Sequence, residues 1–146
     1  MSEEIGLEKP KVIGELIGEN RQVLLSTVPF AVAVGMDVVA VGPGRATLSL
    51  AWREDLVGNP ETGVLHGGII TALIDQACGV AVICSLPKMT SIATLDLRID
   101  YLRPATPGQT VLVEAECYRK TRSIAFIRAL AHHGNRDDAI AHSVAT

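Results

Sequence analysis

One carboxylate lies inside a long apolar segment and is the side chain of this sequence best placed to do chemistry. Residues 69–84 read IITALIDQACGVAVIC, and Asp75 is the one charged residue among them. A carboxylate with restricted access to water can act as a general base or as a nucleophile. The alternative is a carboxylate whose only role is structural, satisfied by neighbouring hydrogen-bond donors. Periodicity alone leaves both interpretations of Asp75 open.

Asp75 shares one helical face with small and polar residues. Gly67, Thr71 and Gly79 are spaced from it by multiples of four, so they stack on one side of a helix. A glycine inside a helix costs about 1 kcal/mol relative to alanine, so Gly79 indicates the close approach of another backbone or of a ligand. Gly67 and Gly68 begin the helix. The first backbone NH groups of a helix lack intrahelical acceptors and can donate to a polarised oxygen.

The helix that positions these residues is predicted to be buried, because residues 69–84 are apolar on nearly all sides of the helical wheel. A membrane span is the competing interpretation. Asp75 and Gln76 interrupt the run, and its uncharged parts fall short of the ~18 to 20 residues that a bilayer requires. We therefore expect a core helix and no association with a membrane.

Six strands are predicted around this helix. The expected ranges are Ala31–Val41, Arg45–Trp52, Ser91–Leu102, Thr110–Arg119, Ser123–His132 and Ala139–Val144. Before them, Lys11–Thr27 predicts a short amphipathic helix that Pro29 ends, within an N-terminal extension over residues 1–28. The order predicts a single α+β domain over residues 1–146, in which a curved antiparallel sheet wraps one long helix.

Composition excludes several classes of function. The chain has 146 residues, of which 48% are hydrophobic and 20% charged, as in a globular protein. Aromatic residues make up only 3% and the net charge is −3, which argues against a nucleic-acid partner. Cys78, Cys84 and Cys117 lie in apolar sequence without metal-binding spacing, so we expect reduced thiols and no metal. The N-terminus lacks an apolar signal region, and we expect a cytoplasmic protein.

The stretch 59–75 resembles the signature N-x-x-G-x-x-H-G-G-x6-D of hotdog-fold acyl-CoA thioesterases of the phenylacetate-pathway (PaaI-like) and human THEM type. The matching residues are Asn59, Gly63, His66, Gly67, Gly68 and Asp75. Asn59 lies one residue farther from His66 than is usual in that family. The resemblance implies the hotdog fold, with one long helix wrapped by the sheet, and hydrolysis of an acyl-CoA thioester to a free acid and coenzyme A.

The resemblance also implies roles for individual residues. The NH of Gly67, aided by the Asn59 amide, would polarise the thioester carbonyl, and Asp75 would act as general base or nucleophile. Thr94 stands seven residues before the tyrosine of the YLRP motif at 101–104 and would orient the attacking water; a plain strand threonine is the alternative. His66 is expected to fix the loop, because no serine or cysteine nucleophile stands beside it.

A cationic turn completes the set of candidate binding residues. Arg119, Lys120 and Arg122 would most often form an ordinary solvated turn. They could also bind the phosphate groups of coenzyme A. His66 and Gly68 are the other candidate substrate-binding residues. The acyl group would enter the apolar space beside the helix. Coenzyme A is then part of the substrate, and we expect no other cofactor.

Self-association and two alternative functions complete the expectations. The resemblance implies that two subunits join their sheets through the strand after the helix, and that each site takes the helix start of one chain and the Asp of the other. We expect a dimer or a dimer of dimers. The alternatives are a non-catalytic acyl-CoA-binding protein and a hydratase-type enzyme of the same fold. Asp137 and His142 have hydratase-like D-x4-H spacing, but they fall on a turn and on the last strand.

Overall fold

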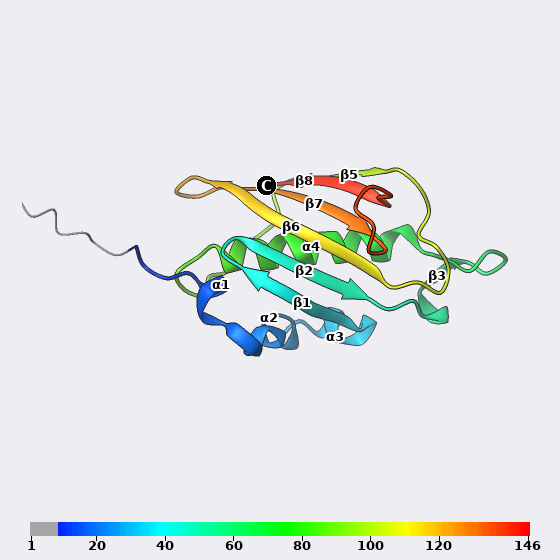
Figure 1. The fold of residues 1–146 in the computed structure, drawn as a ribbon, viewed down its shortest axis with the longest axis horizontal. Helices are drawn as coiled ribbons and strands as arrows, with labels where there is room; N and C mark the ends of the chain where they lie inside the picture. Colours follow the sequence, from blue (N-terminus) through cyan, green and yellow to red (C-terminus); the bar gives the residue numbers. More distant parts are fainter. Residues whose placement is uncertain (1–8) are drawn as a thin grey trace, which may run out of the picture.

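The computed structural model describes residues 9–146 and places one long helix against a six-stranded antiparallel sheet (Figure 1). The helix, α4, spans Gly67–Cys84. The strand order across the sheet is β1-β2-β6-β7-β8-β5. The strands are β1 (Met36–Gly42), β2 (Arg45–Leu50), β5 (Leu97–Tyr101), β6 (Val111–Lys120), β7 (Ala125–His132) and β8 (Ala141–Ala145). This arrangement confirms the predicted α+β fold.

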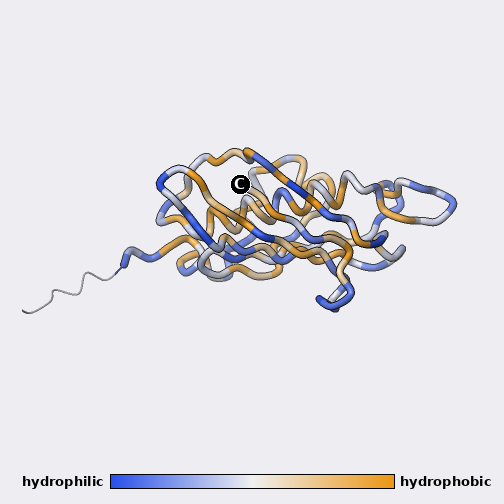
Figure 2. Tube along the Cα trace, turned by 90° about the horizontal axis from the view of Figure 1, so that it is seen from above, coloured by the Kyte–Doolittle hydropathy of each residue, from blue (hydrophilic) through white to orange (hydrophobic). Residues whose placement is uncertain are grey.

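The core lies between α4 and the middle of the sheet. Strands β2, β6 and β7 contact the helix, and Figure 1 shows α4 lying across one face of these strands. Alternate residues point to the helix, so Leu48 pairs with Val113 in the register of β2 and β6, and both are fully buried. Leu73 and Ile74 of α4 are fully buried against them. Figure 2 shows hydrophobic residues concentrated in the body of the molecule and hydrophilic ones in the projecting turns.

Helix α4 is only partly covered by its own sheet. By length and composition alone it could cross a membrane, but half of its apolar window is buried inside the protein. Thr71, Asp75 and Gly79 are half-buried, and Gly67 is exposed. The face that carries the candidate chemistry therefore points away from the sheet, which differs from the expectation of a helix wrapped on all sides.

The N-terminal segment folds differently from the prediction. One amphipathic helix was expected, but the chain forms α1 (Ile13–Leu16), a 3-10 turn η1 (Gly18–Gln22) and α2 (Val23–Ser26). Pro29 begins helix α3 (Pro29–Val34) and does not end one, since proline fits the first helical position, whose NH needs no partner. Gly35 ends α3 in the left-handed conformation at φ 76°, and β1 starts only at Met36.

One edge of the sheet is blocked by a side chain. The Gln22 amide nitrogen donates to the carbonyl of Val38 at 3.1 Å, and the NH of Val38 donates to Gln22 Oε1 at 3.3 Å. Arg21 Nε donates to the same carbonyl at 2.9 Å. The side chains thus occupy a backbone position of β1 that another strand would use, next to a register shift between Val38 and Ala40.

The opposite edge is shorter than predicted and open. Only Leu97–Tyr101 forms β5, whereas residues 91–96 were expected to belong to the same strand. Their alternating pattern suits a strand. The neighbouring strand β8, however, ends at Ala145, and the last backbone hydrogen bonds between the two segments join Thr146 to Leu95 and Asp96. Beyond them no strand of the described chain lies alongside. The ends of the other strands after β1 differ from the prediction by one or two residues.

The loop before α4 also carries unpredicted structure. A 3-10 turn, η2 (Glu54–Leu56), leads into a small hairpin of β3 (Val57–Asn59) and β4 (Val64–Leu65). This hairpin projects from the body beside the start of α4 (Figure 1). Trp52 Nε1 holds its base by donating to the carbonyl of Gly63 at 2.8 Å.

Candidate active site

His66 and Gly68 together form the cap that starts α4. His66 is the N-cap residue, and its Nδ1 accepts a hydrogen bond from the NH of Gly68 at 2.8 Å. The NH of His66 donates to the carbonyl of Leu56 at 2.9 Å, which ties the cap to the preceding turn. A Cβ on Gly68 would lie 2.9 Å from His66 Nδ1, so a side chain there would push the ring away. This geometry explains the local need for both residues.

Gly67 presents an open backbone NH at the same helix start. Among residues 9–146 no hydrogen-bond acceptor takes this NH, and a Cβ on Gly67 would meet no atom within 4 Å. The positive end of the helix dipole adds to the attraction for an oxygen that carries partial negative charge. The position can therefore hold a polarised carbonyl oxygen.

Tyr101 anchors this first turn from the edge strand, a role that sequence reasoning missed. Its hydroxyl donates to the carbonyl of Gly67 at 2.8 Å and lies 2.7 Å from Thr71 Oγ1. Thr71 Oγ1 also contacts the Gly67 carbonyl at 3.2 Å. The only sequence signal was the position of Tyr101 within YLRP, which does not reveal a contact made across 34 residues.

Asp75 and Thr94 meet on the exposed side of α4. Thr94 Oγ1 donates a hydrogen bond of 2.8 Å to Asp75 Oδ1, although Thr94 lies on an irregular segment and not on the predicted strand. No donor among residues 9–146 bonds the other carboxylate oxygen, Oδ2. The arrangement leaves Oδ2 free to accept from a water molecule while the hydroxyl fixes the plane of the carboxylate.

Neither cysteine of the helix competes with Asp75 as a nucleophile. Burial, and secondarily the charge of Asp75, raise the pKa of Cys78 to about 12. Burial raises the pKa of Cys84 to about 11. The thiolate is the reactive form, so both thiols are inert near neutral pH. Both remain unbonded to other cysteines, as does Cys117, in agreement with the expectation of reduced thiols.

A single chain does not bring Gly67 and Asp75 to one substrate atom. Eight residues of helix separate them, which corresponds to about 12 Å along the axis. Gly67 lines a cavity of about 390 Å³ together with Tyr101, whereas Thr94 lines a different cavity of the same volume. A thioester carbonyl that receives the NH of Gly67 therefore lies out of reach of the carboxylate in the same chain.

Asn59 is placed apart from these groups. It ends β3 in the projecting hairpin, where its Oδ1 accepts from the NH of Glu61 at 3.0 Å. Its carbonyl accepts from the NH of Gly63 at 2.9 Å. Among the described hydrogen bonds, none joins Asn59 to Gly67 or to Asp75. Within one chain, the side-chain oxygen of Asn59 is used to shape the hairpin turn.

The three cations of the predicted turn are in different situations. Lys120 Nζ donates to the carbonyl of Ser85, the C-cap residue of α4, so it stabilises the helix end. Arg119 and Arg122 are exposed, and neither guanidinium has a side-chain partner within residues 9–146. Lys120 and Arg122 line the same cavity as Thr94, whereas Arg119 lies outside it.

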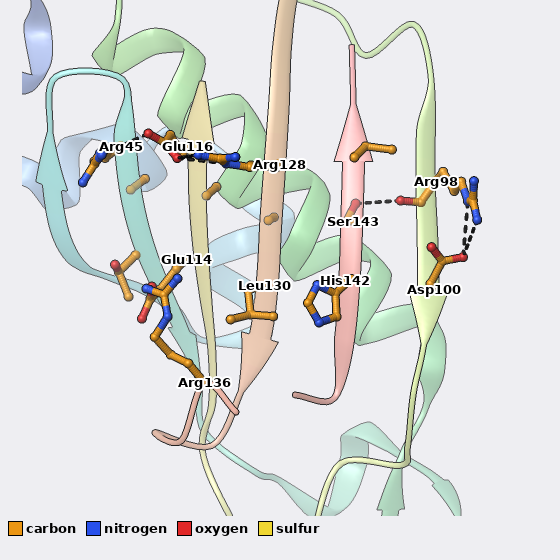
Figure 3. Close-up of a pocket in the computed structure, with 15 residues that line it drawn as sticks. Arg45, Arg98, Asp100, Glu114, Glu116, Arg128, Leu130, Arg136, His142 and Ser143 are labelled. Atoms are coloured by element: carbon orange, nitrogen blue, oxygen red, sulfur yellow. Dashed lines mark hydrogen bonds and ion pairs between the residues drawn. The ribbon is translucent and has the colours of Figure 1, made fainter. Parts of the chain in front are cut away.

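A larger groove, of about 690 Å³, lies on the sheet face opposite α4 (Figure 3). Its charges are paired: Glu116 accepts from Arg128 and from Arg45, and the Arg128 contact is the main cause that lowers the pKa of Glu116. The His142 side chain points into this groove, while Asp137 belongs to a turn with Asn135. His142 thus lies on the face of the sheet away from α4.

No group of three His, Cys, Asp or Glu residues within residues 9–146 is arranged to hold a metal ion. The chemistry that the described site offers consists of a carboxylate with a hydroxyl partner, an open NH at a helix start, and a cavity beside each. Such a set is suited to proton abstraction from water and to stabilisation of an oxyanion.

Comparison with known proteins agrees with this chemistry. The model of the family described as the thioesterase superfamily matches residues 62–140. A putative esterase of Halobacterium salinarum is 41% identical over 75 residues, which cover 49% of this chain and 50% of the esterase, so the match spans about half of that relative. The medium/long-chain acyl-CoA thioesterase YigI of Escherichia coli is 27% identical over 132 residues, 82% of this chain and 83% of YigI.

A solved structure shows the same architecture. A protein from Pseudomonas aeruginosa is 41% identical to this chain and superimposes with a TM-score of 0.79, covering 87% of this chain and 94% of that one. The predicted hotdog fold is thereby confirmed.

Proposed function

Because the chain belongs to the thioesterase superfamily, we propose that it hydrolyses an acyl-CoA thioester to a free acid and coenzyme A. The E. coli relative that aligns over most of this chain carries the name of a medium/long-chain acyl-CoA thioesterase, which supports an acyl-CoA substrate. The observation that carries the proposal is the hydrogen bond of 2.8 Å between Thr94 Oγ1 and Asp75 Oδ1 beside a cavity.

In the proposed mechanism Asp75 is the basic or nucleophilic group. Its unbonded Oδ2 either removes a proton from water as the water attacks the thioester carbon, or attacks that carbon itself. Thr94 holds the carboxylate and orients the water. When water attacks directly, the coenzyme A thiolate leaves and takes up the proton that Asp75 removed from that water. When Asp75 attacks, the thiolate leaves behind a mixed anhydride on Asp75, and a water molecule then hydrolyses this anhydride, releases the acid and supplies the proton for the thiol.

The open NH of Gly67 supplies the complementary electrostatic part. It donates to the carbonyl oxygen, whose negative charge grows as the tetrahedral intermediate forms, and the helix start favours that charge. His66 and Gly68 hold the first turn in place through the cap, and Tyr101 holds it through the carbonyl of Gly67. Once a second chain approaches the hairpin, the side-chain amide of Asn59 would donate a second hydrogen bond to the thioester carbonyl.

A complete site needs two chains in this proposal. Gly67 and Asp75 are about 12 Å apart along α4, so in this proposal each site takes Gly67 from one chain and Asp75 from the other. The open edge at β5 supplies the contact surface, since Gln22 occupies the β1 edge. Large apolar side chains are exposed along the open edge and the segment before it: Met89, Ile92, Leu95 and Tyr101. We infer a homodimer joined at this edge, and a dimer of dimers as its larger form.

Coenzyme A is bound through its phosphates in the same proposal. Arg119 and Arg122 have free guanidinium groups, while Lys120 is committed to the carbonyl of Ser85. The turn borders the cavity that Thr94 lines, so bound phosphates would lie on the approach to the reacting carboxylate. The mechanism uses no metal and no cofactor besides the coenzyme A of the substrate. The cytoplasm, where acyl-CoA is available, remains the predicted location.

A panel of acyl-CoA substrates with detection of the released thiol tests the proposal. Hydrolysis releases one thiol per acyl-CoA consumed, whatever the saturation of the acyl group. An acyl-CoA-binding protein would bind the same compounds without release of thiol. A hydratase would consume only 2-enoyl-CoA and would leave the thioester intact. Either of these two outcomes would replace the hydrolase by the corresponding alternative.

A further inference from the structure

A cavity of about 390 Å³ begins directly beside the Asp75–Thr94 pair. It lies between the C-terminal half of α4 and the irregular segment 90–95. Its volume falls within the range of about 300–1,000 Å³ that small-molecule sites have. Its apolar lining comes from α4 (Cys78 and Val82), from the segment 90–95 (Ile92 and Leu95) and from β7 (Ile127).

Gly79 forms the part of this lining that stands one helical turn beyond Asp75. The four-residue spacing puts Gly79 on the same helical face as the carboxylate. A Cβ built on it would meet only Ile92 Cδ1, at 3.8 Å, which is an ordinary contact. Packing within the chain therefore does not require a glycine here, and glycine is less favourable than alanine inside a helix. The missing side chain instead keeps the cavity open next to the reacting group.

We propose that Gly79 is a specificity-determining residue, and that the space above it receives the aliphatic acyl chain of the substrate. This inference rests on the proposed thioesterase function. A thioester whose carbonyl carbon lies at Asp75 directs its acyl chain along the same face of α4, where the apolar lining lies. Ile92, on the opposite side of the opening, limits the width of the chain that fits.

The pantetheine arm of coenzyme A is the competing occupant, because Arg122, proposed above to bind a phosphate group, lines the cavity together with Thr121 and Ser123. The two occupants predict different responses to a bulky side chain at Gly79. If the cavity holds the acyl chain, a bulky side chain lowers kcat/KM more for each added methylene, since one methylene in an apolar pocket changes kcat/KM by about 10- to 200-fold. Loss of pantetheine space weakens every acyl-CoA by the same factor.

The experiment compares Gly79→Leu with the wild type on acetyl-, hexanoyl- and decanoyl-CoA. We expect kcat/KM for decanoyl-CoA to fall at least tenfold more than kcat/KM for acetyl-CoA. Gly42→Leu is the control, because a Cβ on Gly42 meets no atom within 4 Å and the residue lies at the end of β1, outside the cavity. The control should leave the chain-length profile unchanged. A uniform loss over all three substrates, or no loss, would overturn the proposal.

Two further measurements keep the result decisive. Ile92→Ala widens the cavity and should shift the preferred substrate to longer chains, so an unchanged profile counts against the proposal even if Gly79→Leu does not fold. Calorimetric binding of non-hydrolysable acyl-CoA thioethers of the same lengths separates the two levels of inference. A wild type that binds them with the expected length dependence but releases no thiol refutes the thioesterase function and retains the acyl site. A wild type that binds none refutes both.

Discussion

Thr94 Oγ1 lies 2.8 Å from Asp75 Oδ1, and this bond joins an irregular segment at the open sheet edge to the middle of the long helix. The two residues are 19 positions apart in the chain. The contact gives the carboxylate one fixed donor and leaves its second oxygen without a donor from residues 9–146. Asp75 is therefore neither fully satisfied nor fully buried, which favours a chemical role over a purely structural one.

Asp75→Asn is the sharpest test of that role. The change nearly preserves volume but removes the charge and the basicity, so kcat should fall by roughly 10²–10⁴ while binding of coenzyme A persists. Turnover and the thermal midpoint are measured on the same preparation. Near wild-type turnover in the folded variant would exclude Asp75 as base or nucleophile. A structural carboxylate would show a lowered midpoint with intact turnover.

Thr94→Val removes the hydroxyl while keeping the shape of the side chain. A hydrogen bond to a charged group contributes about 1.5–3 kcal/mol, so kcat should fall about tenfold or more. Thr94→Ser is the control, since it retains the donor and should keep most of the activity. Equal rates in the valine and serine variants would show that the hydroxyl has no part in turnover.

The two glycines at the helix start should respond differently to alanine. Gly68→Ala places a Cβ 2.9 Å from His66 Nδ1 and disrupts the cap, which should lower the free energy of unfolding by about 0.5–2 kcal/mol. Gly67→Ala meets no atom of the chain, so the thermal midpoint should stay or rise, whereas kcat should drop by roughly 10² if the carbonyl lies there. Melting curves and kcat of both variants decide the question. The reverse pattern would remove Gly67 from the site.

Within the cationic turn, the two arginines and Lys120 should have different functions. Arg119→Ala and Arg122→Ala should each raise KM about two- to fivefold with little change in kcat, since an exposed ion pair contributes at most about 1 kcal/mol. The effect should weaken in salt. Lys120→Met should instead lower the thermal midpoint, because it removes the donor to the Ser85 carbonyl. If KM at low ionic strength does not change in either arginine variant, the turn is an ordinary solvated one.

Assembly through the open edge predicts a position-dependent effect of a charge. Leu95 is 70% exposed in the single chain, and light scattering at micromolar concentration should show that Leu95→Asp is a monomer. Val39, on the blocked edge, is 45% exposed, and Val39→Asp should remain dimeric and active. An active wild-type monomer would contradict the two-chain site, because Gly67 and Asp75 of one chain would then have to serve the same substrate.

Local patterns were sufficient to predict α4 and the six strands, since these depend on periodicity that each segment carries by itself. The failures have long-range causes. Residues 91–96 alternate like a strand but have no neighbouring strand within the described chain. Pro29 is a local exception, since it starts a helix because proline fits the first helical position. The bonds of Tyr101 to Gly67 and of Lys120 to Ser85 join distant segments. Spacing and resemblance were enough to propose candidate residues. They did not predict the hydrogen-bond partner of each residue.

The Gln22 amide on Val38 also determines how many chains one sheet can recruit. A sheet with two free edges adds copies at both ends and can grow into an open-ended filament. In the proposed dimer two copies pair through the β5 edge by a twofold axis, so this edge is used up and is not available to a third chain. At the other edge, Gln22 and Arg21 occupy the backbone groups of Val38 that an added strand would need. Their loss would expose a second strand edge and would turn a self-limiting assembly into one able to aggregate.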